Sequence, residues 1–153
     1  MAHIRTQIRN ALSTRLTGLT TTGARVFNNR LEPLQFTELP ALLVMNDSEI
    51  INGRSFGSQL APHARRELRT ISYKVRAVVK ANAAIEDTLD QICLETEKAI
   101  GSDIFMGGLT VDARLISTVY EKDESSDKVE AIADMIFEFD TWVLNTTPDV
   151  VVA

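Results

Sequence analysis

The residue types that could do chemistry are few and far apart in this chain. The two histidines are His3 and His63, and the single cysteine is Cys93. Cys93 falls on the apolar side of a helical pattern, where cysteine behaves as a small hydrophobe. An active site would need His63 to meet Cys93 or a carboxylate in the folded chain. We therefore predict no catalytic residues and no enzyme activity, and one cysteine excludes an internal disulfide.

The acidic and glycine-rich segments also lack the spacing of a known site. Asp87 and Asp90 share a helix face with other acids, which is typical of a solvated surface. Residues 53–57 contain two glycines without the Lys-Ser or Lys-Thr of a phosphate loop. Residues 123–127 lack the ligand spacing of an EF-hand and are better explained as a hairpin tip. We predict no metal and no cofactor.

The hydrophobic pattern predicts two amphipathic helices and several strands. Apolar residues recur at helical spacing over residues 2–17 and 83–100, and Gly18 and Gly101 follow as stops. Strands are expected over residues 24–27, 39–45, 65–80, 109–119 and 129–143, the last two as an antiparallel hairpin. Residues 46–64 are the least regular part, into which Ile50 and Ile51 can extend a strand. The order predicts an α+β fold, a mixed and mainly antiparallel sheet with both helices packed on one face.

Size and composition fit one ordinary domain. The chain has 153 residues, of which 44% are hydrophobic, enough for a core without disulfides or metals. We expect a single domain over residues 1–145 and a flexible tail over residues 146–153. No secretory leader and no apolar run of membrane-spanning length are seen, so we expect a soluble intracellular protein without a membrane partner.

The net charge of −5 combines two unlike halves. Residues 1–80 carry 12 Lys and Arg against 5 Asp and Glu, whereas residues 81–153 carry 4 against 16. The charges are either scattered over solvated faces or gathered into one basic and one acidic face. A subunit of the second kind attracts copies of itself head to tail, and such contacts close into rings or continue as filaments.

Several passages, taken in order, resemble the tail terminator proteins of long-tailed, lambda-like bacteriophages. The most specific are the helix ending at Gly18, the Thr-Gly-Ala-Arg-Val-Phe passage of residues 22–27, and the Leu-Pro-Ala-Leu passage of residues 39–42. Weaker matches are residues 65–68 and 78–81, the acidic helix at 87–90, residues 107–109, and a last strand ending near Trp142. The resemblance covers most of the chain, and the order of the passages carries it.

The resemblance implies a structural virion protein and not an enzyme. Such a subunit forms a ring, in this family of six copies, on the head-proximal end of the tail tube and stops tube polymerisation. Its partners are the major tail tube protein and a neck or connector protein of the head. Genome DNA passes through the hole without sequence-specific binding. The implied location is the virion tail, assembled in the bacterial host cytoplasm.

The residues themselves suggest where such a ring could close. Charge favours a contact between arginines on one side and helix acids on the other, and an apolar anchor is expected beside them because exposed ion pairs contribute only about 0–1 kcal/mol. A hole that passes DNA is expected to be neutral or acidic. The interface candidates are Arg54, Phe56, Leu60, Arg65, Arg66, Arg69, Glu86, Asp87, Asp90 and Glu97, and the lumen candidates are Asp123, Glu124 and Asp127.

Three other functions remain open at this point. One is another head-tail connector or tail-completion protein of the neck. The second is a small enzyme, for which replacing His63 with alanine should abolish activity and otherwise leave assembly intact. The third is a nucleic-acid-binding protein using the basic half, which predicts affinity that falls steeply with salt. The scattered arginines, without interleaved aromatic residues, and the acidic net charge favour the third least.

Overall fold

The computed structural model describes residues 1–30, 34–56, 63–80, 84–123 and 130–152, apart from the side chains of residues 36, 53–56 and 123. Its helices are α1 (Ile4–Leu16) and α2 (Ile85–Gly101), with short 3-10 turns at Phe36–Glu38 and Met106–Gly108. The strands are β1 (Val26–Asn28), β2 (Ala41–Phe56), β3 (Arg65–Lys80), β4 (Asp112–Asp123), β5 (Glu130–Leu144) and β6 (Thr147–Val151).

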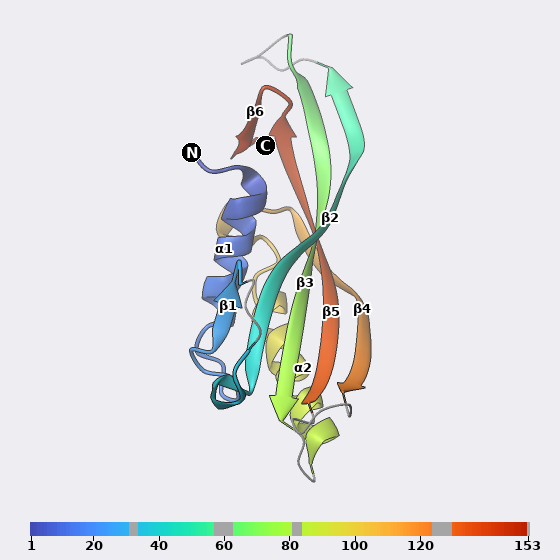
Figure 1. Ribbon diagram of the computed structural model, residues 1–153. Coiled ribbons are helices and arrows are strands. Elements are labelled where there is room, and N and C mark those ends of the chain that lie inside the picture. Colours follow the sequence, from blue (N-terminus) through green and yellow to red (C-terminus); the bar gives the residue numbers. More distant parts are fainter. Residues whose placement is uncertain (31–33, 57–62, 81–83, 124–129, 153) are drawn as a thin grey trace.

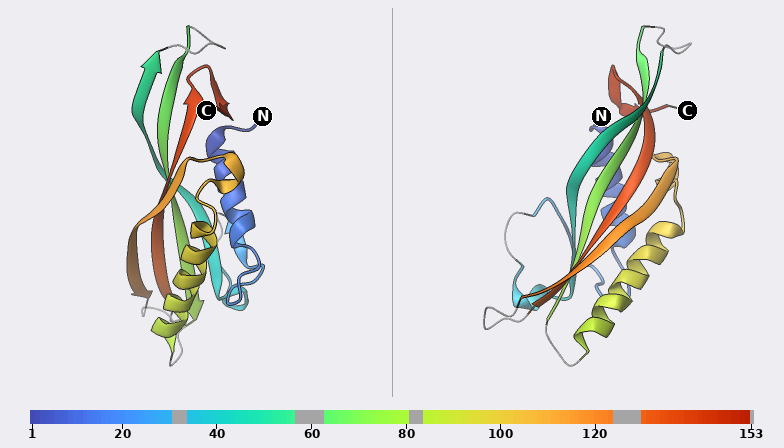
Figure 2. Two further views of the ribbon diagram at one scale, coloured as in Figure 1. Left: turned by 180° about the vertical axis from the view of Figure 1, so that it is seen from behind. Right: turned by 90° about the vertical axis from the view of Figure 1, so that its right-hand side faces the viewer.

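One long, twisted sheet forms the body of the molecule, with the order β1-β2-β3-β5-β4 and with β6 paired to β5 (Figure 1). Neighbouring strands are antiparallel except for β1 and β2. Both helices cover the same face, hereafter the helix face, as the two views of Figure 2 show. The predicted α+β fold is therefore confirmed. The other face of the sheet is called the outer face below.

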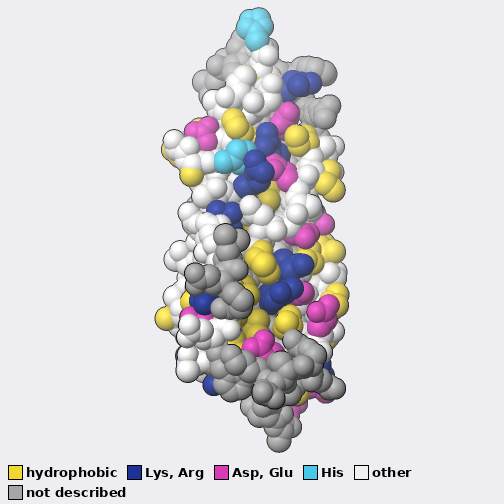
Figure 3. Space-filling model, viewed as in Figure 1, with side chains coloured by type: hydrophobic (Ala, Val, Ile, Leu, Met, Phe, Trp, Pro, Cys, Tyr) yellow, Lys and Arg dark blue, Asp and Glu magenta, His cyan; other side chains and the backbone are white. Residues whose placement is uncertain are grey.

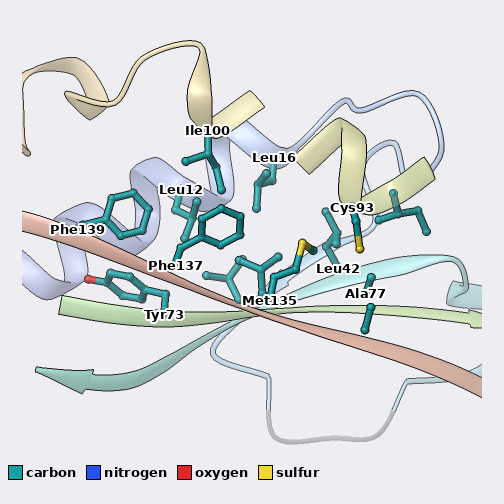
Figure 4. Close-up of a cluster of buried hydrophobic side chains, with 14 of the residues drawn as sticks. Leu12, Leu16, Leu42, Tyr73, Ala77, Cys93, Ile100, Met135, Phe137 and Phe139 are labelled. Atoms are coloured by element: carbon teal, nitrogen blue, oxygen red, sulfur yellow. The ribbon is translucent and has the colours of Figure 1, made fainter. Parts of the chain in front are cut away.

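The helix face carries the main core because apolar residues alternate along the central strands. The α1 residues Ile4, Ile8, Leu12 and Leu16 are fully buried, as the i, i+4 spacing predicts. They meet β3 and β5 side chains in the cluster of Figure 4. Within it the rings of Tyr73 and Phe139 make an edge contact at 5.7 Å between centroids. The Tyr73 hydroxyl donates to the Arg5 carbonyl at 2.6 Å, which joins β3 to the first turn of α1.

Strand β2 is longer than predicted. Residues 46–56, expected to be irregular, continue the strand beside β3. The register shifts between Asn46 and Ser48 and again between Ile51 and Gly53. The polar and glycine residues that resembled loop signals therefore lie at bulges, which interrupt pairing without ending the strand. Residues 57–62 of the predicted irregular segment lie outside the described residues.

The C-terminal segment also differs from expectation. Instead of a flexible tail, Thr147–Val151 forms β6 against β5, and Val151 packs on the main core. The Gln7 amide donates to the Asp149 carbonyl at 2.7 Å, which ties β6 to α1. The prediction failed because Pro148 was taken as a sign of irregular structure, although proline is accepted in short edge strands.

Two neighbouring valines test whether β6 stabilises the domain. Val151→Ala removes core packing and should lower the free energy of unfolding by about 1 kcal/mol. Val150→Ala, at a side chain that is 42% exposed, should change it by less than about 0.5 kcal/mol. Urea unfolding of both variants measures the difference. Equal stability of both variants and the parent chain would show that the segment does not contribute.

Candidate subunit interface

The residues considered for catalysis lie in three separate places. The His3 ring caps α1, accepting the Arg5 backbone N–H at 3.1 Å. Cys93 is buried on α2, and its burial raises the pKa of its thiol to about 11, which disfavours the reactive thiolate. His63 is exposed in the turn before β3. Among the described residues, no group of three or more His, Cys, Asp or Glu side chains could hold a metal ion.

The predicted arginine candidates lie near the β2–β3 hairpin end and are partly occupied within the subunit. The Arg66 guanidinium carbon lies 4.1 Å from the centroid of the Trp142 ring. Arg69 is mostly buried, with ion pairs of 2.9 Å to Glu49 and 3.1 Å to Glu67. Arg65 is exposed at the start of β3.

The other candidates near that hairpin are less completely placed. Residues 54 and 56 belong to β2, but the side chains of Arg54 and Phe56 are not described, and Leu60 lies outside the described residues. Of the three lumen candidates, Asp123 ends β4 without a described side chain, whereas Glu124 and Asp127 lie outside the described residues. Their predicted roles therefore stay predictions.

The acidic candidates all lie on α2, three of them near its first turns. Glu86 pairs with the Lys122 ammonium at 2.9 Å, and Asp90 accepts from the Tyr120 hydroxyl at 3.4 Å. Asp87 and Glu97 are exposed. These contacts place α2 above the second half of β4. Figure 1 shows this end of the sheet opposite the β2–β3 hairpin, so the arginine and acidic candidates lie at opposite ends of the long axis.

Besides the charge difference along the long axis, a second one runs across the sheet, between the side that α1 covers and the side that α2 covers. Helix α1 contains three arginines and no acidic residue, whereas α2 contains five acidic residues and one lysine. Helix α1 contacts β1 and β2, and α2 contacts β3, β5 and β4. The helix face is therefore basic beside the β2 edge and acidic beside the β4 edge. The outer face in Figure 3 shows basic and acidic side chains next to one another.

The middle of the β4 edge carries exposed apolar side chains on both faces of the sheet, with Leu115 and Tyr120 on the helix face and Val119 on the outer face. The exposed fractions are 36% for Leu115, 50% for Ile116, 54% for Val119 and 56% for Tyr120. In the described chain, β5 is the single strand partner of β4. Edge strands normally carry charges or proline that oppose further pairing, and β4 carries its charged residues at its two ends, whereas residues 115–120 in its middle have none. Exposed apolar side chains beside unpaired backbone groups are typical of surfaces that take part in protein–protein contacts.

The opposite edge is also partly open. Strand β1 pairs with β2 at Leu42, Leu43 and Val44 alone. Beyond Val44, β3 is the single strand paired with β2 among the described residues. Ile50 and Ile51 on this open part have exposed fractions of 58% and 38%. An alternating hydrophobic pattern predicts a strand but not its place in the sheet, so the sequence analysis did not identify either open edge.

No family model matches the sequence, and neither does any curated protein. Within the described residues, no helix combines the length and the apolar character needed to cross a membrane. The geometry of the two edges is therefore the basis for a functional assignment.

A charged cluster attaches the start of α1 to the open part of β2. Glu49 pairs with Arg5 at 3.2 Å and with Arg69 at 2.9 Å, next to the His3 ring. Burial, followed by the charge of Arg5, lowers the pKa of His3 below its ordinary value of 6.5. The folded protein therefore favours the neutral ring that accepts the Arg5 N–H. The unfolded chain binds this proton more readily, so the stabilisation is present above pH 6.5 and is lost as pH falls below it.

We predict that the free energy of unfolding decreases between about pH 7.5 and pH 5.5 because of His3. His3→Asn keeps an N-cap oxygen and should reduce this decrease, since asparagine does not titrate. His63→Asn is the matched control and should keep the parent pH dependence. Chemical denaturation at a series of pH values measures all three proteins. An unchanged pH dependence in His3→Asn would contradict the assignment.

Proposed function

We propose that this protein is a tail terminator subunit, which forms a ring on the head-proximal end of a phage tail tube. The ring stops tube polymerisation and offers a surface to the neck of the head. The observation that carries the proposal is that one sheet has two open edges of different character. One is β4, beside the acidic helix α2, and the other is the second half of β2, beside the basic helix α1. It is supported by the ordered resemblance of the sequence passages to this family.

Unlike edges favour a ring because each copy can use one edge to contact the other edge of the next copy. Contacts of this head-to-tail kind close when the rotation between copies divides a full turn. The acidic side near β4 and the basic side near α1 favour unlike edges meeting over like edges. Apolar residues on both edges supply the buried area that exposed charges do not. The number of six copies rests on the resemblance alone.

In the proposed ring we place the outer face on the hole, and its paired charges are compatible with the passage of DNA. Arg76 pairs with Asp134 at 2.7 Å, and Arg114 pairs with Asp140 and Glu138, each at 2.8 Å. Pairing with carboxylates lowers the attraction of these arginines for phosphate groups. DNA that must move is retained less by such a surface than by one of unpaired basic residues.

Negative-stain microscopy with tail tubes that lack a terminator tests the proposed function. We expect the purified protein to bind at one end of each tube and the tubes to stop growing when more tube protein is added. Tube length distributions, with and without the protein, measure the second effect. Continued growth without end binding would contradict the proposal. Binding to the head connector instead would favour the alternative, another neck or tail-completion protein.

A further inference from the structure

The open edges have matching lengths. Strand β4 contains 12 residues, Asp112–Asp123. The part of β2 beyond its pairing with β1 runs from Met45 to Phe56, which is also 12 residues. A strand the length of β4 therefore fits beside this part of β2 without displacing β1.

Strand direction is compatible with the same contact. From β2 to β3, β5 and β4 each neighbour reverses direction. In a ring every copy has the same orientation about the axis, so the β2 of the next copy is antiparallel to β4. The alternation would continue across the boundary, and antiparallel pairing satisfies the free backbone N–H and C=O groups of both edges.

We propose that β4 of one copy pairs, antiparallel, with residues 45–56 of β2 in the next copy. The inference rests on the proposed ring and names the contact that closes it. Placing Val119 opposite Ile50 pairs residues 113–123 of β4 with residues 46–56 of β2 and puts Asp123 near Asn46, just beyond the residues that β1 occupies. Val119 of β4 then covers the exposed Ile50.

The side chains of this pair lie on the same face of the joined sheets. Val119 is opposite Asp134 of β5, and Ile50 is opposite Thr70 of β3, both on the outer face. Ile51 lies on the helix face, opposite Arg69. Since neighbouring residues of a strand point to opposite faces, Val119 can contact Ile50 but not Ile51 in this arrangement.

The same placement brings opposite charges together on the helix face. The contacts of Glu86 with Lys122 and of Asp90 with Tyr120 fix the start of α2 above the end of β4. In the next copy, Arg9 donates to Asn46 at 3.0 Å, and the Nε of Arg9 is buried without a hydrogen-bond partner in the described chain. When the end of β4 lies near Asn46, the acids of α2 lie level with this arginine.

The offset along the strand direction between Ile50 and Val119 of one subunit fits a ring whose strands are inclined to its axis. Within one subunit, Ile50 of β2 pairs with Thr70 of β3. Val119 of β4 pairs with Asp134 of β5, which in turn pairs with Arg76 of β3. The two positions are therefore six residues apart, measured along β3. Six residues along a strand are about 20 Å, and four strand spacings from one β2 to the next are about 19 Å. Strands inclined by about 45° to the ring axis produce this offset, a tilt known from closed sheets.

A two-fold contact between two β4 edges is less favourable. It would place the acidic α2 helices of both copies near one another, and like charges across an interface oppose association. It would also leave the open part of β2 without a partner. The contact between unlike edges covers both apolar surfaces, so we choose it over the two-fold contact.

Cysteine cross-linking tests the pairing directly. In a Cys93→Ala background, Val119→Cys is combined in turn with Ser48→Cys, Ile50→Cys or Asn52→Cys, and each protein is oxidised at the highest soluble concentration. We expect a ladder of linked oligomers that ends at the ring size for at least one of these pairs. A disulfide requires Cβ atoms about 3.5–4.5 Å apart, so the best pair reports the register.

Two controls separate this contact from others. Val119→Cys with Ile51→Cys should lose the ladder, because these side chains lie on opposite faces. Val119→Cys alone should not form dimers; efficient dimers would indicate the two-fold contact and overturn the inference. Circular dichroism melting confirms that each variant folds, and a misfolded position is replaced by its neighbour on the same face.

The results also separate the inference from the proposed function. A ring at the tube end without any ladder would overturn the strand pairing and leave the terminator function standing. A ladder with no binding to tail tubes would support the pairing and remove the assignment to tails. The absence of both the ladder and the end binding would overturn the inference and the proposed function together.

Discussion

The unpaired outer backbone of two unlike strands is the constraint on which the account depends. Antiparallel strands β2, β3, β5 and β4 satisfy one another inside the sheet, but the sheet stays open at β4 and along the second half of β2. Exposed apolar side chains accompany both open stretches. Water can hydrogen-bond to the free N–H and C=O groups, but the exposed apolar area stays unfavourable in water, so burial against a partner chain would lower the free energy.

The rest of the fold gives these edges their different character. The buried stripe of α1 and the bond from Tyr73 to Arg5 fix the arginine-bearing helix beside β2. The buried residues of α2 fix the acidic helix between the sheet centre and β4. Charge alone contributes little at exposed sites, yet it decides which edges meet. The core thus determines the polarity of a subunit whose function we place in its contacts with copies of itself.

The sequence predicted which residues form helices and strands better than it predicted which strands lie next to one another. The alternation in β3 defined its bounds because its apolar residues face one continuous core. The second half of β2 was expected to be mostly irregular because Asn46, Asp47 and Asn52-Gly53, which lie at or beside bulges, have the residue types of turns. The edge position of β4 could not be predicted, since strand order is set by long-range pairing. For the same reason Arg69 was considered a surface cation, although two carboxylates from neighbouring positions of the sheet enclose it.

The central claim is that unlike edges close copies of this chain into one ring, and the symmetry of the particle at a tube end tests it most directly. Cryo-electron microscopy of capped tail tubes gives this symmetry without any substitution in the chain. The account predicts a single closed ring, with six copies related by rotation and with β4 of each copy beside β2 of the next. A two-fold dimer, an open helical filament, or a ring whose β4 strands face solvent would contradict it.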